Sequence, residues 1–289
     1  MVIIKLMGGL GNQMFQFACG RALAHRHSVE LKLDHSFLEN RKHQEGFTYR
    51  NYELNAFGIN LRINDIELKK VQIMRYISKI LTMQHYYKYV EEKDPYRANI
   101  IFPNYPKLYL SGYFQSEKYF AEISEIIQRD FTFIKPQSEY QNLINYIGEI
   151  ENPISVLIRR DDFIKLKGDF LLKMEYYKRA IDIIKSEVRN PHFLIFTIGD
   201  TKWVKEHFKV DADFEIVENE NPDLRGFEKM RLISLCKHNI IANSSFGWWG
   251  AWLNKNNEKI VVVPKKWLND EIMDKKIMEN RIPDKWIKL

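Results

Sequence analysis

Short apolar runs alternate with amphipathic stretches through the second half of the chain. The runs are rich in β-branched and aromatic residues, which is typical of strands buried on both faces of a parallel sheet. They fall at 154–158, 193–198, 214–217, 239–242 and 260–263. The intervening stretches carry apolar residues at helical spacing, at 173–188, 202–208, 227–236 and 246–254. This alternation predicts an α/β fold with a doubly wound parallel sheet.

The first half opens on a strand at 2–6, a glycine loop, a helix at 14–27 and a second strand at 29–33. Glycines directly after a strand let backbone N–H groups approach a ligand at the N-terminus of the next helix. The loop matches neither the dinucleotide fingerprint nor the P-loop. A tight turn without a ligand is therefore the alternative interpretation.

A polar segment bounded by Pro136 and Pro153 separates the two halves and predicts a domain boundary. We expect an N-terminal α/β domain over 1–135 and a C-terminal Rossmann-like domain over 154–264. The tail, 265–289, has mixed charge and is expected to pack back across the domains.

Composition narrows the class of partner. The chain has 289 residues, a net charge of +6 and two cysteines. The positive charge suits an anionic ligand or an acidic membrane surface, but no basic-aromatic motif supports nucleic-acid binding. Two thiols form no disulfide framework, and no run approaches the roughly 18 apolar residues of a membrane span. We expect a cytoplasmic protein, and peripheral contact with the inner membrane surface is left open.

Two adjacent arginines, Arg159 and Arg160, follow the predicted strand at 154–158. Ligands of open α/β sheets bind at the carboxyl ends of the strands. Two guanidinium groups there suit a diphosphate, because each offers a rigid fork of donors that stays charged. An ion-pair cluster with Asp161 and Asp162 is the alternative.

Other polar residues follow neighbouring strands and are expected to line the same crevice: Asp200, Asn243, Ser244 and Ser245. Either serine is also a candidate N-cap for the helix predicted from 246. Asp200 is a candidate for a helix N-cap or for a hydrogen-bond partner of a ribose or base edge. Paired aspartates at 161–162 are able to hold Mg²⁺ or Mn²⁺. We favour a site without metal, because the arginines beside them neutralise a diphosphate.

Five stretches, spread in order over nearly the whole chain, carry a resemblance to a known family. They are Gly8-Gly9-Leu10-Gly11-Asn12-Gln13-Met14-Phe15-Gln16, Gly112-Tyr113-Phe114-Gln115-Ser116, Arg159-Arg160-x-Asp162-Phe163, Tyr176-Tyr177, and Leu235-Cys236-Lys237-His238-Asn239-Ile240-Ile241-Ala242-Asn243-Ser244-Ser245-Phe246, which continues as Trp248-Trp249-Gly250-Ala251-Trp252-Leu253-Asn254. Together they resemble the bacterial α-1,2-fucosyltransferases of glycosyltransferase family 11, which also contains the animal blood-group H enzymes. The resemblance implies two Rossmann-like domains facing a cleft, the GT-B architecture.

The resemblance also implies an activity. L-Fucose would pass from GDP-β-L-fucose to the 2-hydroxyl of a terminal galactose, with inversion to an α-1,2 linkage and with no metal or other cofactor. The acceptor would be a cell-surface glycan or its precursor, such as O-antigen, either lipid-linked or free. The domain over 1–135 would face the acceptor, and the domain over 154–264 would bind GDP-fucose.

Site residues are assigned on the same basis. Catalysis is expected from Arg159, with Asp162 a weak candidate for the base that takes the acceptor proton. Donor contacts are expected from Gly11, Asn12, Arg159, Arg160, Asp200, Asn243, Ser244, Ser245 and Phe246. Acceptor contacts are expected from Gln13, Tyr113 and Gln115.

The chain departs from the family pattern at three places. Leu157 stands where the family usually has His, Asp161 where it usually has Gly, and Gly247 where Ser is common. These departures put the nucleotide contact of that histidine in doubt. A transferase of another linkage or nucleotide sugar, and a binding protein without turnover, are the alternative functions.

Overall fold

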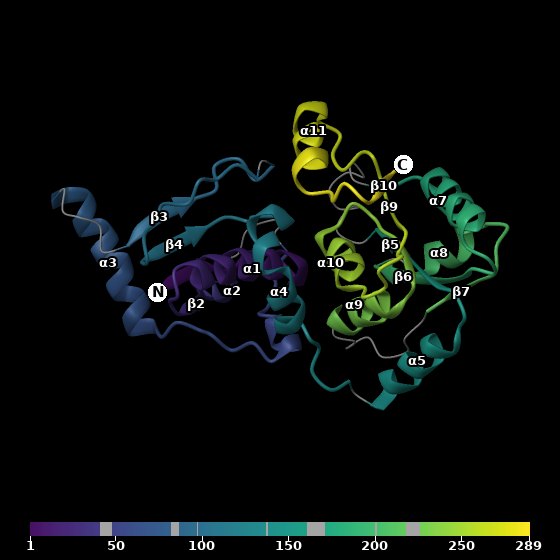
Figure 1. Ribbon diagram of the computed structural model, residues 1–289, viewed down its shortest axis with the longest axis horizontal. Helices are drawn as coiled ribbons and strands as arrows, with labels where there is room; N and C mark the ends of the chain where they lie inside the picture. The colour runs from purple at the N-terminus through teal and green to yellow at the C-terminus, as the bar shows by residue number, and fades with distance from the viewer. Residues whose placement is uncertain are drawn as a thin grey trace. The chain divides into compact units, whose positions relative to one another are not determined.

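The computed structural model describes residues 1–40, 48–81, 87–96, 98–136, 138–160, 171–199, 201–217 and 226–289. It divides into two compact units, Met1–Thr132 and Phe133–Leu289. Each unit has a sheet whose paired strands all run parallel, and helices pack on its faces (Figure 1). The predicted α/β class is confirmed.

The sheet of the first unit has the strand order β2-β1-β4-β3. Its strands are β1 (Val2–Lys5), β2 (Leu31–Asp34), β3 (Lys88–Glu91) and β4 (Leu108–Ser111). The long helices are α1 (Leu10–Arg26) and α3 (Asp65–Leu81); the shorter elements are α2 (Ser36–Glu39), η1 (Leu54–Phe57), η2 (Glu117–Tyr119), η3 (Ala121–Ile123) and α4 (Ser124–Asp130). Successive strand residues face opposite ways. Ile4 therefore lies under α1 at Gly20, whereas Ile3 joins a core with Val71 of α3.

The sheet of the second unit has the order β10-β9-β8-β5-β6-β7. Its strands are β5 (Pro153–Arg159), β6 (His192–Ile198), β7 (Phe214–Ile216), β8 (His238–Ile240), β9 (Val261–Val263) and β10 (Ile287–Lys288). When β5 is counted as the first strand and the sheet is read from β7 to β10, the strand order is 3-2-1-4-5-6. This is the order of the dinucleotide-binding Rossmann fold. The chain first builds outward through β6 and β7 and then returns to the other side of β5. The order therefore reverses between β5 and β8.

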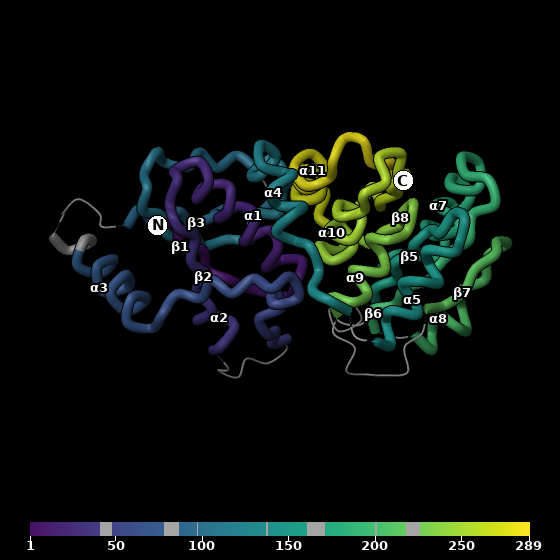
Figure 2. The backbone as a smooth tube through the Cα atoms, turned by 60° about the horizontal axis from the view of Figure 1, so that its bottom comes forward, coloured from purple at the N-terminus to yellow at the C-terminus, as the bar shows by residue number. Residues whose placement is uncertain are grey.

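Helices cover both faces of this sheet (Figure 2). They are α5 (Ser138–Glu149), α7 (Met174–Glu187), α8 (Thr201–His207), α9 (Gly226–Leu235) and α10 (Ser245–Leu253). A further helix, α11 (Glu271–Asn280), lies in the C-terminal segment. Val156 and Ile158 of β5 pack in one core with side chains of α7 and α8, whereas Leu157 packs in another with side chains of α5 and α9. The side of β5 on which a residue lies thus decides which helices it meets.

The structure adds detail to two segments of the sequence-based interpretation. The polar segment in which we expected the domain boundary contains α5, which packs on α9 within the second unit. The tail also belongs to this unit, because β10 pairs with β9 and the indole Nε1 of Trp248 donates to the carbonyl of Arg281 at 2.9 Å.

Candidate functional site

Arg159 is the last residue of β5 and lies beside the point where the strand order reverses. In open α/β sheets this switch point is where ligands bind, beyond the carboxyl ends of the strands. Arg159 has the same parity along β5 as Leu157, so it lies on the face that α9 and α10 cover. Its Nη1 donates to Oγ of Ser244 at 2.7 Å. The structure thus joins a predicted residue at the end of β5 to a predicted residue after β8.

Ser244 is also the N-cap of α10. Its extended backbone (φ −140°, ψ 133°) lets Oγ accept from the N–H of Phe246 at 3.2 Å. The N-terminus of a helix carries a partial positive charge and backbone N–H groups that attract anions. Arg159 adds a full positive charge at that helix end, so the pair forms an electropositive corner at the switch point.

The side chain of Arg160 points to the opposite face of the sheet from that of Arg159, because successive side chains alternate along a strand. Its guanidinium carbon lies 3.5 Å from the ring centroid of Trp203 on α8, and its N–H donates to the carbonyl of Ile198 at 3.1 Å. The two arginines therefore do not share one face. Stacking on Trp203 gives Arg160 a structural role at this edge of the sheet, and its donor contact stays a prediction.

The remaining predicted residues of the second unit have varied surroundings. Asn243 is only 6% exposed, and its Nδ2 donates to the carbonyl of Trp267 at 3.1 Å, so it anchors the C-terminal segment. Ser245 and Phe246 are half-buried in the first turn of α10. Asp162 and Asp200, with Asp161, lie outside the described residues.

A second constellation forms at the reversal of the first sheet, between β1 and β4. Nε2 of Gln115 donates to Oδ1 of Asn12 at 2.6 Å, and both side chains are half-buried. Tyr113 is also half-buried, and its backbone N–H donates to the carboxylate of Glu92. Asn12 and Gln115 are thus in contact where the sheet would bind a ligand, and Tyr113 belongs to the same loop as Gln115.

Two fully buried glutamines hold this constellation. Nε2 of Gln13 donates to the carbonyls of Gly8 (2.9 Å) and Asn51 (2.7 Å), and its Oε1 accepts from the N–H of Glu53 at 3.0 Å. Gln16 bridges the two loops, because it accepts from Met7 N–H at 2.9 Å and donates to Gly112 O at 3.0 Å. We predicted acceptor binding for Gln13. Because the side chain has no exposed surface, we assign it instead to positioning the loop.

The glycine loop itself is shaped by close contacts. Gly8 has φ +75°, which a residue with a Cβ adopts only with strain, and a Cβ there would also run into the side chain of Asn12. Gly11 is buried within the first turn of α1, and the N–H of Leu10 donates to the carboxylate of Glu53. Burial raises the pKa of Glu53, against the opposing charge of Arg50 and the bond from Leu10. A protein carboxylate thus already occupies part of the N-terminus of α1.

Several of these residues were missed from the sequence. Glu53 and Glu92 lie in the irregular tyrosine-rich region, and no short motif marks them. Lys229 of α9 was missed too: its Nζ donates to the carbonyl of Thr197 at 2.8 Å near the end of β6, and burial lowers its pKa. Each comes from a segment remote in sequence from the motif it supports, so local spacing gave no signal.

Comparison with known proteins identifies the family of this chain. The family model described as glycosyl transferase family 11 matches residues 1–289. The chain belongs to glycosyl transferase family 11. Among its relatives, the O-antigen biosynthesis glycosyltransferase WbnK of Escherichia coli is 32% identical over 98% of this chain and 99% of its own. An α-1,2-colitosyltransferase of Escherichia coli is 30% identical over 100% of this chain and 98% of its own.

A solved structure shares the fold of this family 11 member. A mutant of Arabidopsis thaliana FUT1 in complex with GDP superposes with a TM-score of 0.52 at 12% identity, covering 90% of this chain and 69% of that one. At that identity the likeness concerns the fold alone, and it supports the predicted GT-B class. No helix in the described part of the chain is long and apolar enough to cross a bilayer.

Two of the departures from the family pattern touch each other. A Cβ at Gly247 would lie 2.8 Å from Cδ2 of Leu157 and 3.2 Å from Cβ of Ile241. Leu157 is fully buried and fills the space that a side chain at 247 would need. The leucine in β5 and the glycine in α10 are therefore sterically matched.

We expect Gly247→Ala to lower the free energy of unfolding by about 1–3 kcal/mol, because it overpacks this contact. In the Leu157→Val background the added methyl should cost less, with a coupling of at least about 0.5 kcal/mol in a double-mutant cycle followed by urea denaturation. Gly148→Ala is the control, since nothing lies within 4 Å of its Cβ position in α5. Strictly additive effects would contradict the steric match.

Proposed function

We propose that the chain transfers L-fucose from GDP-β-L-fucose to the 2-hydroxyl of a terminal galactose, forming an α-1,2 linkage with inversion. Membership of family 11 and the α-1,2-colitosyltransferase relative support a reaction of this type. The contact of Arg159 with the capped end of α10 is the observation that carries the proposal. It gives a leaving diphosphate a preorganised partner at the switch point of a nucleotide-binding sheet.

The barrier to the reaction is the breaking of the bond between sugar C1 and the diphosphate oxygen. Negative charge grows on the diphosphate as the bond breaks, so donors already aimed at it stabilise the transition state more than the ground state. One preorganised donor of this kind typically contributes about 3–4 kcal/mol. Ser244 holds the guanidinium of Arg159 in place before the substrate arrives, so little reorganisation is needed.

The acceptor would bind at the reversal point of the first sheet. Asn12, Tyr113 and Gln115 offer amide and hydroxyl groups of the kind that hydrogen-bond to sugar hydroxyls. Asp162 is a weak candidate for the base, because a neighbouring arginine would lower its basicity. If the transition state is strongly oxocarbenium-like, the departing diphosphate takes the proton instead. An O-antigen precursor is the acceptor class that the relative WbnK suggests.

Donor identity has a second candidate with specific support. The full-length relative from Escherichia coli is a colitosyltransferase, and colitose is fucose without its 3-hydroxyl. We expect GDP-fucose to give the higher kcat/KM, with GDP-colitose the poorer donor. Parallel kinetics with both donors, and NMR of the product linkage, test this. A reversed preference would make colitose the donor, and no turnover with either would favour a binding protein.

Arg159→Ala should reduce kcat at least tenfold while the protein stays folded, because the diphosphate loses its main cation; a tenfold loss corresponds to about 1.4 kcal/mol. Arg179→Ala, at an exposed position on α7, is the control and should keep wild-type turnover. Kinetics with GDP-fucose and a β-galactoside measure both. If Arg159→Ala keeps more than a tenth of the turnover, the residue has no catalytic role.

Metal independence is also proposed. Within the described ranges no group of three His, Cys, Asp or Glu side chains could hold a metal ion. The Asp161–Asp162 pair lies outside them, and Arg159 supplies positive charge for the diphosphate. Turnover should therefore persist in excess EDTA. Complete loss that added Mn²⁺ restores would instead support a metal site at the paired aspartates.

A further inference from the structure

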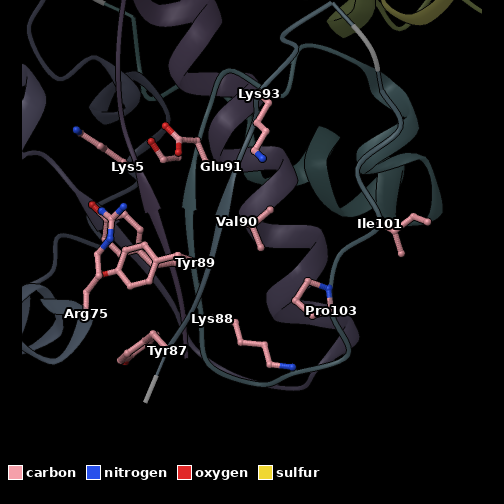
Figure 3. A pocket seen from close by; sticks show the side chains of 12 residues that line it. Lys5, Arg75, Tyr87, Lys88, Tyr89, Val90, Glu91, Lys93, Ile101 and Pro103 are labelled. Atoms are coloured by element: carbon pink, nitrogen blue, oxygen red, sulfur yellow. The ribbon is translucent and has the colours of Figure 1, made fainter. Parts of the chain in front are cut away.

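A basic groove lies on the α3 face of the first sheet, apart from the residues assigned so far. Two cavities of about 790 Å³ and 370 Å³ share four lining residues, Lys5, Arg75, Tyr89 and Tyr109. Figure 3 shows the larger cavity, with Lys5, Arg75, Tyr89 and Glu91 on one side of β3 and Lys88, Lys93 and Pro103 on the other. We call the part around the four shared residues the α3 groove.

An aromatic stack orders the α3 groove. The rings of Tyr89 and Tyr109, which are paired across β3 and β4, have centroids 4.7 Å apart at 30°. The guanidinium carbon of Arg75 lies 4.2 Å from the Tyr89 centroid, so this ring is covered by Tyr109 and Arg75. The hydroxyl of Tyr109 donates to Asp34, which is fully buried. Stacking on Tyr89 fixes the plane of the Arg75 guanidinium.

The charge balance of the groove is positive. Two of its four defining residues, Lys5 and Arg75, carry positive charge, and Glu91 is the carboxylate beside them in the lining of the larger cavity. In the part of the chain that the structure describes, Lys5 makes no ion pair; its Nζ lies 5.4 Å from the Phe37 ring centroid.

The two phenols of the α3 groove, Tyr89 and Tyr109, stay neutral. Burial raises the pKa of Tyr109 and of Tyr89, with Arg75 opposing the shift in both. The Tyr109 hydroxyl donates to Asp34 and the Tyr89 hydroxyl to the carbonyl of Val71, so a ligand would meet cations beside a covered aromatic face. This chemistry suits a carboxylate or a phosphate on a hydroxylated ligand better than a nucleobase, which needs a free ring to stack on.

The groove adjoins the proposed acceptor residues along the chain. Lys5 ends β1 only three residues before Gly8, a separation of roughly 10 Å in extended chain. Tyr109 and Ser111 belong to β4, which leads directly to Tyr113 and Gln115. A glycan held at Tyr113 and Gln115 would therefore reach the α3 groove with a sugar a residue or two away from the galactose.

We propose that the α3 groove binds an anionic group, a carboxylate or a phosphate, carried by a sugar of the acceptor glycan. That the glycan is the acceptor of the reaction rests on the proposed function, but the residues of the site all lie in the first unit. Lys5 and the stacked Arg75 are its specificity-determining residues.

Direct binding tests it without any turnover. Methyl β-D-glucuronide, glucose 6-phosphate and neutral methyl β-D-glucoside are titrated into the full chain by ligand-observed NMR. We expect an anionic sugar to bind at least about fivefold more tightly than the neutral one, with the gain falling as salt rises. A preference for the glucuronide indicates a uronic-acid sugar, and a preference for the phosphate indicates a phosphorylated one. Equal affinity for all three ligands would overturn the proposal.

Variants identify the site. Lys5→Gln and Arg75→Gln should each remove most of the preference for the anion, whereas Lys70→Gln, exposed on the same helix as Arg75, should keep it. Tyr89→Phe should also keep the preference because stacking survives, and Tyr89→Leu should weaken it; circular dichroism checks that each variant is folded. Wild-type anion preference in both Lys5→Gln and Arg75→Gln would also overturn the assignment.

The activity assay keeps the two proposals separate. Transfer from GDP-fucose to a neutral β-galactoside is measured on the wild-type chain. If that transfer fails while the anion preference and its variants behave as expected, the proposed function is wrong and the groove stands as a binding site. If transfer succeeds without any anion preference, the inference about the groove alone is wrong.

Discussion

The hydrogen bond from Arg159 to Ser244 joins the two strands between which the order of the second sheet reverses. A parallel sheet with this order leaves a gap beyond the carboxyl ends of those strands, because the following connections run to opposite sides. Arg159 brings a full charge to that gap, and Ser244 brings the end of α10. Neither residue alone would make a directed anion partner. Their contact depends on the register of β5 against β8 and on the start of α10.

In the first unit, amide side chains rather than charged ones lie at the point where the strand order reverses. The strand order of its sheet reverses between β1 and β4, and the loops that follow these two strands meet there. Gln13 and Gln16, both fully buried, bind backbone groups of these loops and so fix where Asn12 and Gln115 lie. A neutral, hydroxyl-rich ligand needs such directional bonds more than it needs charge.

Much of this could be predicted from the sequence because it depends on local pattern. The strand at 154–158, the helices that follow and the polar residues after each strand were all visible as changes of periodicity. The divergence of Arg159 and Arg160 follows from strand alternation but was not foreseen, since it depends on which helix covers which face. Glu53 and the stack of Arg75 on Tyr89 depend on contacts between segments far apart in the chain, and no spacing rule reaches them.

The tryptophans are distributed unevenly between the two units. All six, including the three of α10, lie in the second unit, and the rings of Trp248 and Trp249 are 4.9 Å apart. The intrinsic indole emission of this protein is therefore a signal of one unit only, while the tyrosine-rich first unit is dark at those wavelengths. Indole emission would therefore report unfolding or ligand binding in the second unit, and the first unit would need a separate probe.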